Sequence, residues 1–304
     1  MPLWIAATLF AAFMQNLRFL LQRHLKVTTL STGGATLARF LFGAPLAAVL
    51  FGLYAWATGA QLPALNATFW VFVLTGGIAQ ILATMCVVAL FAFRNFAVGI
   101  TLKKTEVMLS AAVGLIVLGD AVSLPVLLAI AIGFIGMLFL SDPPKSDIRL
   151  PLRNRIFNAA SGYGLASGAL FGVSAVAYRG ATLELSSGDA ILRASLTLTA
   201  ATACQLVLLG AYLIWREPGQ LRKVAQSWRV TSLTGLTSIL GSLGWFTAFA
   251  LQTAAYVKAL GQVELVFSFL FSVFFLREKS SAKEIMGLVL ILGSVLLIFW
   301  GSYG

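Results

Sequence analysis

Charged side chains are scarce in this sequence: only 10 of its 304 residues are Asp or Glu, and charged residues of either sign make up 10%. A soluble domain carries roughly 25% charged residues, so this chain has too few to cover a water-facing surface. Hydrophobic residues make up 60% of the chain, and the mean hydropathy is +0.95. Composition therefore indicates an all-α integral membrane protein, in which apolar runs of about 20 residues cross the bilayer.

The side chains of metal sites and catalytic centres are also rare. The one histidine, His24, has no acid nearby, and Cys86 and Cys204 lie inside apolar runs, away from any ligand-like spacing. We therefore predict no catalytic residue, no metal site and no cofactor, and a protein that is not an enzyme. A membrane-embedded enzyme and a channel are the alternatives. The net charge of +11 does not indicate nucleic acid, because the basic residues lie in short loops between apolar runs.

Apolar runs between charge and turn signals predict ten membrane-spanning helices. We expect them near 2–21, 33–57, 69–93, 96–118, 123–140, 157–179, 188–214, 229–251, 255–276 and 283–301. Of the eight prolines, only Pro45 falls well inside a span, so we expect continuous helices. Continuous helices favour proton coupling or simple exchange over a sodium site built from unwound carbonyls.

A polar, proline-containing stretch at 142–156 predicts a cytoplasmic linker between residues 1–141 and residues 157–304. Fifteen of the 21 lysines and arginines, Arg18 among them, fall in or beside the odd-numbered loops. The positive-inside rule then places these loops in the cytoplasm and both termini outside a bacterial inner membrane. The expected partners are the lipid bilayer and a small-molecule substrate, in a monomer or weak homodimer.

The second part of the sequence repeats the first. TEVMLSAAVGLIVLGDAVS at 105–123 aligns with VELVFSFLFSVFFLREKSS at 263–281, so that Glu106 matches Glu264 at an offset of 158 (264 − 106). Five spans per repeat, an odd number, would give the halves opposite orientations. Inverted repeats of this kind are typical of transporters, with the substrate site at their interface and alternating access between the two sides.

This doubled pattern consists of Glu, about ten apolar residues, Leu-Gly-Asp or Leu-Arg-Glu, a short loop and a glycine-rich final helix. It resembles the paired signature of the EamA-like branch of the drug/metabolite transporter superfamily, over essentially the whole chain. The resemblance implies that helices 1–4 and 6–9 surround a central cavity, with helices 5 and 10 at the periphery. It also implies a secondary transporter of small metabolites, working by efflux or exchange. Uptake of a vitamin, nucleotide or cationic metabolite is the alternative.

Only Glu106 and Glu264, among the ten acids, lie clearly within predicted spans. Such groups are costly in a bilayer and normally face a cavity or a partner. Four residues later on the same helical face come Ser110 and Ser268, and these two faces could meet across the cavity to bind substrate or carry protons. The structural alternative is neutralisation, because Lys103 lies three residues before Glu106.

Basic residues within the spans favour an anionic or zwitterionic, amino-acid-like substrate. Lys103, Lys104 and Lys258 would make the cavity more basic than acidic, although two adjacent lysines cannot share one face, so one of them must snorkel or pair elsewhere. Arg39 and Arg193 match across the halves. We interpret them as gates at opposite mouths or as interfacial anchors.

Other polar or aromatic residues in the spans are candidates either for lining the cavity or for hydrogen bonds between helices. They are Gln15, Asn16, Gln80, Trp245, Tyr256 and Gln262. Gly164, Gly168 and Gly172 form a stripe of small residues that predicts close helix packing.

Overall fold

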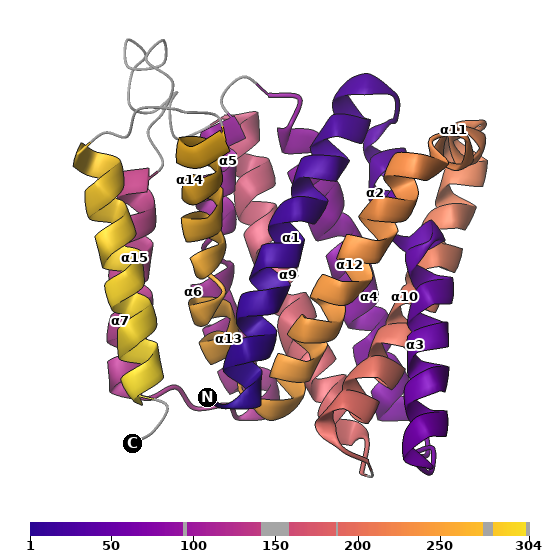
Figure 1. Cartoon of the computed structure of the whole chain (residues 1–304), viewed down its shortest axis with the longest axis horizontal. Helices are drawn as coiled ribbons and strands as arrows, with labels where there is room; N and C mark the ends of the chain where they lie inside the picture. The colour runs from indigo at the N-terminus through magenta and orange to yellow at the C-terminus, as the bar shows by residue number, and fades with distance from the viewer. Residues whose placement is uncertain (94–95, 141–157, 187, 276–281, 302–304) are drawn as a thin grey trace.

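The computed structural model describes residues 1–93, 96–140, 158–186, 188–275 and 282–301, so the linker predicted at 142–156 lies outside the described residues. Within those ranges every regular element is a helix (Figure 1). They are α1 (Leu3–Thr28), α2 (Thr32–Leu41), α3 (Gly43–Thr58), α4 (Ala67–Leu90), α5 (Phe96–Lys103), α6 (Glu106–Leu118), α7 (Leu124–Leu140), α9 (Ala159–Glu184), α10 (Ala190–Arg216), α11 (Gln220–Gln226), α12 (Trp228–Leu251), α13 (Ala254–Leu260), α14 (Val263–Phe275) and α15 (Ala282–Gly301).

The helices stand side by side in one bundle, and the start of α1 and the end of α15 lie at the same edge of it, the lower edge in Figure 1. Six stretches among the described residues are long and apolar enough to cross a membrane: α1, α2 with α3, α4, α9, α10 and α12. This confirms the expectation of an all-helical membrane protein.

The second of these stretches is interrupted at Phe42, where α2 ends and α3 begins. Pro45 explains the interruption, because it has no N–H to donate to the carbonyl of Leu41. Ser31 caps the start of α2 by accepting a hydrogen bond from the N–H of Gly34 at 2.9 Å, and Asp189 caps the start of α10 in the same manner.

Two further helices are interrupted without any proline, and here the expectation of continuous spans was wrong. Between α5 and α6 the chain makes a tight turn at Lys104, whose N–H donates to the carbonyl of Thr101 at 3.0 Å. Between α13 and α14 it turns again at Gln262, whose N–H donates to the carbonyl of Ala259 at 3.2 Å. Such three-residue hydrogen bonds tighten a helix locally and often mark functional hinges. The two turns are 158 positions apart (262 − 104).

The glycine stripe on α9 packs against both sides of the first interruption, as the sequence predicts. A Cβ on Gly164 would overlap the carbonyl oxygen of Gly99 in α5, and one on Gly168 would lie 2.8 Å from the carbonyl oxygen of Lys103. A Cβ on Gly172 would lie 3.1 Å from the backbone nitrogen of Ser110 in α6. The backbones of α5, α6 and α9 therefore touch directly, which holds the turn at Lys104 against α9.

The outermost helices are α7 and α15, which pack against each other at the left edge of Figure 1. Their outward faces carry large apolar side chains such as Leu124, Leu128, Val289 and Leu296, all more than half exposed. An apolar outer surface of this kind suits contact with lipid, because the hydrocarbon core of a bilayer contains no water to solvate polar side chains.

The stripe gives a stability prediction. We expect Gly164→Ala to lower the apparent melting temperature of the purified protein clearly, because the added methyl group meets backbone rather than a side chain that can move aside. Overpacking of this sort costs about 1–3 kcal/mol. Gly162→Ala on the same helix is the matched control, because a Cβ there meets nothing within 4 Å. Equal melting temperatures for the two variants would contradict the direct backbone contact.

Candidate functional site

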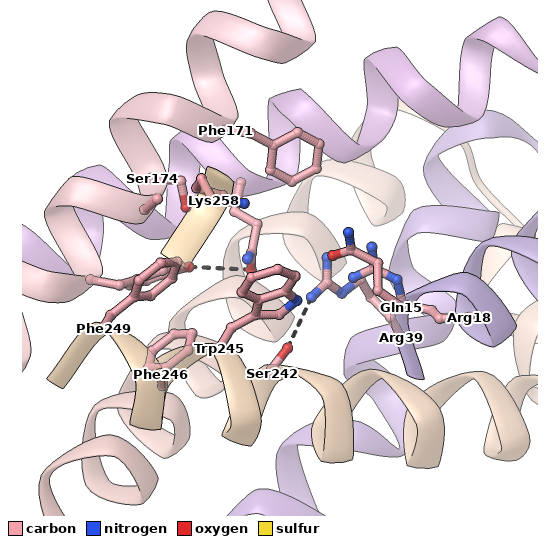
Figure 2. Close-up of a pocket in the computed structure, with 13 residues that line it drawn as sticks. Gln15, Arg18, Arg39, Phe171, Ser174, Ser242, Trp245, Phe246, Phe249 and Lys258 are labelled. Atoms are coloured by element: carbon pink, nitrogen blue, oxygen red, sulfur yellow. Dashed lines mark hydrogen bonds between the residues drawn. The ribbon is translucent and has the colours of Figure 1, made fainter. Parts of the chain in front are cut away.

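A small cavity lies in the middle of the bundle, with a volume of about 30 Å³, enough for one or two water molecules. Its walls come from six helices that are far apart in the sequence: α1, α2, α4, α9, α12 and α13. Figure 2 shows the side chains that line it. Lysine, arginine, amide, hydroxyl and aromatic groups are present in the lining, and no carboxylate is among the described lining residues.

Two arginines line this cavity without a carboxylate partner among the described residues. Arg39 is 1% exposed and donates from Nε to Ser238 at 3.1 Å, with further hydrogen bonds to the hydroxyls of Thr84 and Ser242. Arg18 is 4% exposed; its guanidinium lies over the ring of Phe19, at 4.4 Å from the centroid. Its Nε and Nη2 have no hydrogen-bond partner among the described residues. Buried polar groups are normally paired, so Arg18 is an exception that needs an explanation.

A lysine and several aromatic rings form another part of the wall. Lys258 Nζ lies 4.9 Å from the ring centroid of Trp245, 5.6 Å from that of Phe171 and 6.0 Å from that of Phe249. Trp245 and Phe249 stack with centroids 6.1 Å apart. The ring faces around Lys258 are electron-rich, so they stabilise its ammonium group in the apolar interior.

Reciprocal ion pairs join the two helix interruptions beside the cavity. Lys104, at the turn after α5, contacts Glu264 at 3.1 Å, and Lys258 in α13 contacts Glu106 at 3.9 Å. Lys103 also contacts Glu106, at 3.7 Å, so the neutralising pair considered from the sequence is present. Gln15 in α1 donates to Glu264 at 2.8 Å. Glu106 is the first residue of α6 and Glu264 the second residue of α14, so each lies in a first turn, where the helix dipole also favours negative charge.

A neutral network connects α4, α9 and α10 at the edge of the cavity. Gln205 donates from Nε2 to the amide oxygen of Gln80 at 2.9 Å and to the hydroxyl of Tyr178 at 3.1 Å. Tyr178 donates in turn to Gln80 at 3.3 Å, and its ring packs on Phe246 with centroids 4.3 Å apart. This network holds Gln80 and Tyr178 in place in the cavity wall.

A separate ion pair ties together the end of the bundle where the chain termini lie. Arg179 in α9 donates from Nε and Nη2 to the two carboxylate oxygens of Asp120, at 2.6 and 3.0 Å. Its Nη1 donates to the carbonyls of Phe249 and Gln252 at the end of α12, both at 2.9 Å. Gly119, with φ +69°, reverses the chain after α6 and so presents Asp120 to Arg179.

The structure brings five of the sequence candidates into the cavity lining: Gln15, Arg39, Gln80, Trp245 and Lys258. Lys103, Glu106 and Glu264 are buried beside it in the ion pairs. Ser110 instead faces α9 and donates to the carbonyl of Val107 at 2.9 Å. The side chain of Ser268 lies outside the described residues.

The remaining candidates are not among the described lining residues. The amide of Asn16 points at the carbonyl of Glu264, and Tyr256 shares a hydrogen bond of 2.9 Å with Ser123. Gln262 lies against Gly133 of α7. Arg193 makes a long contact of 3.5 Å with the carbonyl of Thr182, near the start of α10. The gate role that we predicted for Arg39 and Arg193 stays a prediction, although Arg39 lines the central cavity.

Sequence reasoning missed the other eight described lining residues: Arg18, Phe171, Ser174, Ala175, Tyr178, Ser242, Phe246 and Phe249. Arg18 was grouped with the loop charges, whereas α1 continues to Thr28 and carries it inside the bundle. A usable signal was present in helical spacing. Gln15 and Arg18 are three apart, and Ser238, Ser242, Trp245 and Phe249 follow at intervals of three or four on one face of α12. Among the described residues, no three His, Cys, Asp or Glu side chains gather as a metal site would require.

Residues 159–300 match the EamA-like transporter family. This match, over the second part of the chain, places the protein in the drug/metabolite transporter superfamily. A solved structure described as "Crystal structure of protein" aligns over 97% of this chain and 98% of its own chain, with a TM-score of 0.66 and 16% identity. At that identity the likeness shows a common fold alone. No curated protein matches by sequence.

The ion pairs give a prediction that a double-mutant cycle can check. We expect Glu264→Gln to destabilise the protein by about 3–5 kcal/mol, because it leaves the buried Lys104 without its carboxylate. Lys104→Met should cost a similar amount, and the double variant should cost much less than the sum of the two. Melting temperatures of the four proteins in one detergent measure this coupling. Additive effects would show that the two side chains do not stabilise each other.

Proposed function

We propose that this EamA-like transporter is a secondary active transporter of small metabolites, with amino-acid-like zwitterionic or anionic solutes favoured. The observation that carries the proposal is the buried cavity lined by Arg18, Arg39, Lys258 and Trp245, at the centre of an apolar helical bundle. Buried ionisable groups are expensive inside a membrane protein and are typically retained where a solute or ion passes. Transport proceeds by alternating access, in efflux or exchange.

The transport path in this proposal is formed by ten spans in two inverted halves. Beyond the six long stretches, the pairs α5/α6 and α13/α14 and the single helices α7 and α15 supply four more. Helix packing supports the symmetry: α4 packs on α9 and α12 packs on α1, which are equivalent pairs when the halves are exchanged. The N-capping residues Ser31 and Asp189 also keep the offset of 158 (189 − 31).

The cavity disfavours a cationic metabolite. Trp245, Phe249 and Phe171 provide the ring faces on which a cation would bind, and Lys258 already occupies the space over them. A second cation there would meet the charge of Lys258 in a medium of low dielectric constant.

Glu106 and Glu264 are the proposed coupling residues. Each contacts a lysine carried by the other interrupted helix, so a change in the charge of either carboxylate weakens a bond that joins the two helices. Proton uptake and release at these carboxylates would in this way favour different arrangements of the two interrupted helices.

Counterflow in proteoliposomes tests the proposal. A transporter exchanges a preloaded solute for labelled solute outside, whereas an enzyme makes a new compound and a channel only dissipates the gradient. We expect exchange by the wild type, and a fall of about tenfold or more for Glu106→Gln and Glu264→Gln, since each substitution breaks a buried ion pair.

The matched control for this experiment is Glu217→Gln, which makes the same chemical change in the loop between α10 and α11, away from the cavity. It should exchange at close to the wild-type rate. Unchanged rates and an unchanged pH dependence in the two buried variants would contradict the coupling role.

The proposed orientation puts the chain ends outside and the loop of α11 in the cytoplasm of a bacterial cell. We expect Gln61→Cys, at the end of the bundle shared with the termini, to react with an impermeant maleimide in intact cells. Gln226→Cys, at the opposite end, should react only after permeabilisation. Both positions are exposed, and both variants are made with Cys86 and Cys204 replaced by Ala. The reverse pattern would overturn the orientation.

A further inference from the structure

We propose that the solute carried by this protein is an organic anion, and that Arg18 holds its oxyanion head group through the Nε–Nη2 edge of the guanidinium. The proposal deepens the transport function above and rests on it. It assigns a binding residue and a chemical class, a carboxylate or phosphate group on a small organic body.

The first support is the state of Arg18 itself. It lines the central cavity, is 4% exposed, and its Nε and Nη2 have no hydrogen-bond partner among the described residues. These two atoms form the edge of a guanidinium that carries two parallel N–H donors, the geometry that matches both oxygens of a carboxylate or phosphate. A buried, unpaired donor edge is costly unless a ligand satisfies it.

The same chain shows what this edge does when a carboxylate is within reach. In Arg179 the identical atoms, Nε and Nη2, donate to the two oxygens of Asp120 at 2.6 and 3.0 Å. The anion that Arg179 binds is therefore a side chain of the same protein, Asp120, at one end of the bundle. Arg18 lines a cavity whose described lining contains no carboxylate, and its corresponding edge has no hydrogen-bond partner among the described residues.

A second unpaired donor lies in the same wall. The indole Nε1 of Trp245 is buried and also has no hydrogen-bond partner among the described residues. Figure 2 shows the indole ring between Lys258 on one side and the Arg18, Arg39 and Gln15 side chains on the other. An oxyanion bound to Arg18 would therefore find a further N–H donor and a second guanidinium nearby.

The charge around the cavity has the sign that this ligand requires. Five buried basic side chains, Arg18, Arg39, Lys103, Lys104 and Lys258, face two buried carboxylates, Glu106 and Glu264. The ion pairs engage the lysines, whereas the hydrogen bonds of Arg39 go to hydroxyl groups and Nε and Nη2 of Arg18 have no hydrogen-bond partner among the described residues. An excess of positive charge in a low-dielectric interior attracts an anion strongly and repels a cation.

The aromatic side chains suit the rest of the solute. Trp245, Phe249 and Phe171 give the wall flat apolar surface next to the arginines. Small-molecule sites commonly combine such surface with a few polar groups that fix the orientation. Because the cavity measures about 30 Å³ here, a bound solute requires these walls to move apart.

Binding to purified protein tests the assignment. The probes are succinate, glycerol 3-phosphate, the neutral diamide of succinate and the cation putrescine, each measured by the shift in melting temperature. We expect at least one anion to stabilise the wild type, and the diamide and putrescine to have no effect. A response to succinate alone or to glycerol 3-phosphate alone identifies the head group as carboxylate or phosphate.

The variant Arg18→Lys keeps the charge and removes the donor edge, so we expect it to bind the active anion at least tenfold more weakly. The matched control Arg222→Gln removes an exposed arginine of α11 and should bind like the wild type. If Arg18→Lys does not fold, inhibition of wild-type counterflow by the anions and not by the diamide is the deciding measurement.

Stabilisation by the diamide or putrescine alone, no response to either anion, or undiminished binding by Arg18→Lys would each overturn the anion site. Exchange of a cationic or neutral solute that anions do not inhibit would also overturn it, while leaving the transport function intact. Conversely, anion binding that depends on Arg18 in a protein without exchange activity would support the site and contradict the transport function.

Discussion

A charge buried inside a membrane protein must find a partner, and this requirement organises the centre of the bundle. Lys104 pairs with Glu264 and Lys258 with Glu106, so each interrupted helix supplies a lysine for the other's carboxylate. Breaking one pair would leave a charge in a medium where it is poorly solvated. These reciprocal ion pairs fix the position of α5/α6 relative to α13/α14. The cavity between the surrounding helices follows from that position.

The helix interruptions make these reciprocal ion pairs possible. A continuous helix would place Lys103, Lys104 and Glu106 at fixed angles around a single axis. The turn at Lys104 separates the lysine of one helix from the carboxylate that begins the next, so that Lys103 contacts Glu106 while Lys104 reaches Glu264. Both acids then lie at helix N-termini, where the backbone adds favourable charge. Charge pairing and helix interruption are therefore two aspects of one arrangement.

Much of this could be predicted from the sequence. The high hydropathy and the scarcity of charged residues were enough to predict a helical membrane protein. The glycine stripe of α9 was correctly predicted to pack closely against its neighbours. The interruptions at Lys104 and Gln262 were not predicted, because no proline marks them and the turns depend on contacts between distant helices. Arg18 was missed for a related reason: loop charges and cavity charges look alike until the end of α1 is known. Ser110 has the helical spacing expected of a cavity residue, but α9 covers that face.

The backbone contacts of α9 have a mechanical consequence. Gly164, Gly168 and Gly172 leave no side chain between α9 and α5/α6, and α4 packs along α9 as well, whereas α1 packs along α12 and α14. We expect helices joined so closely to move as one rigid body. The groups that shift past each other would then be α4, α5, α6 and α9 on one side and α1, α12 and α14 on the other. Each group contains helices from both the first and the second part of the chain. The boundary between the two moving groups therefore does not coincide with the division of the sequence into two parts.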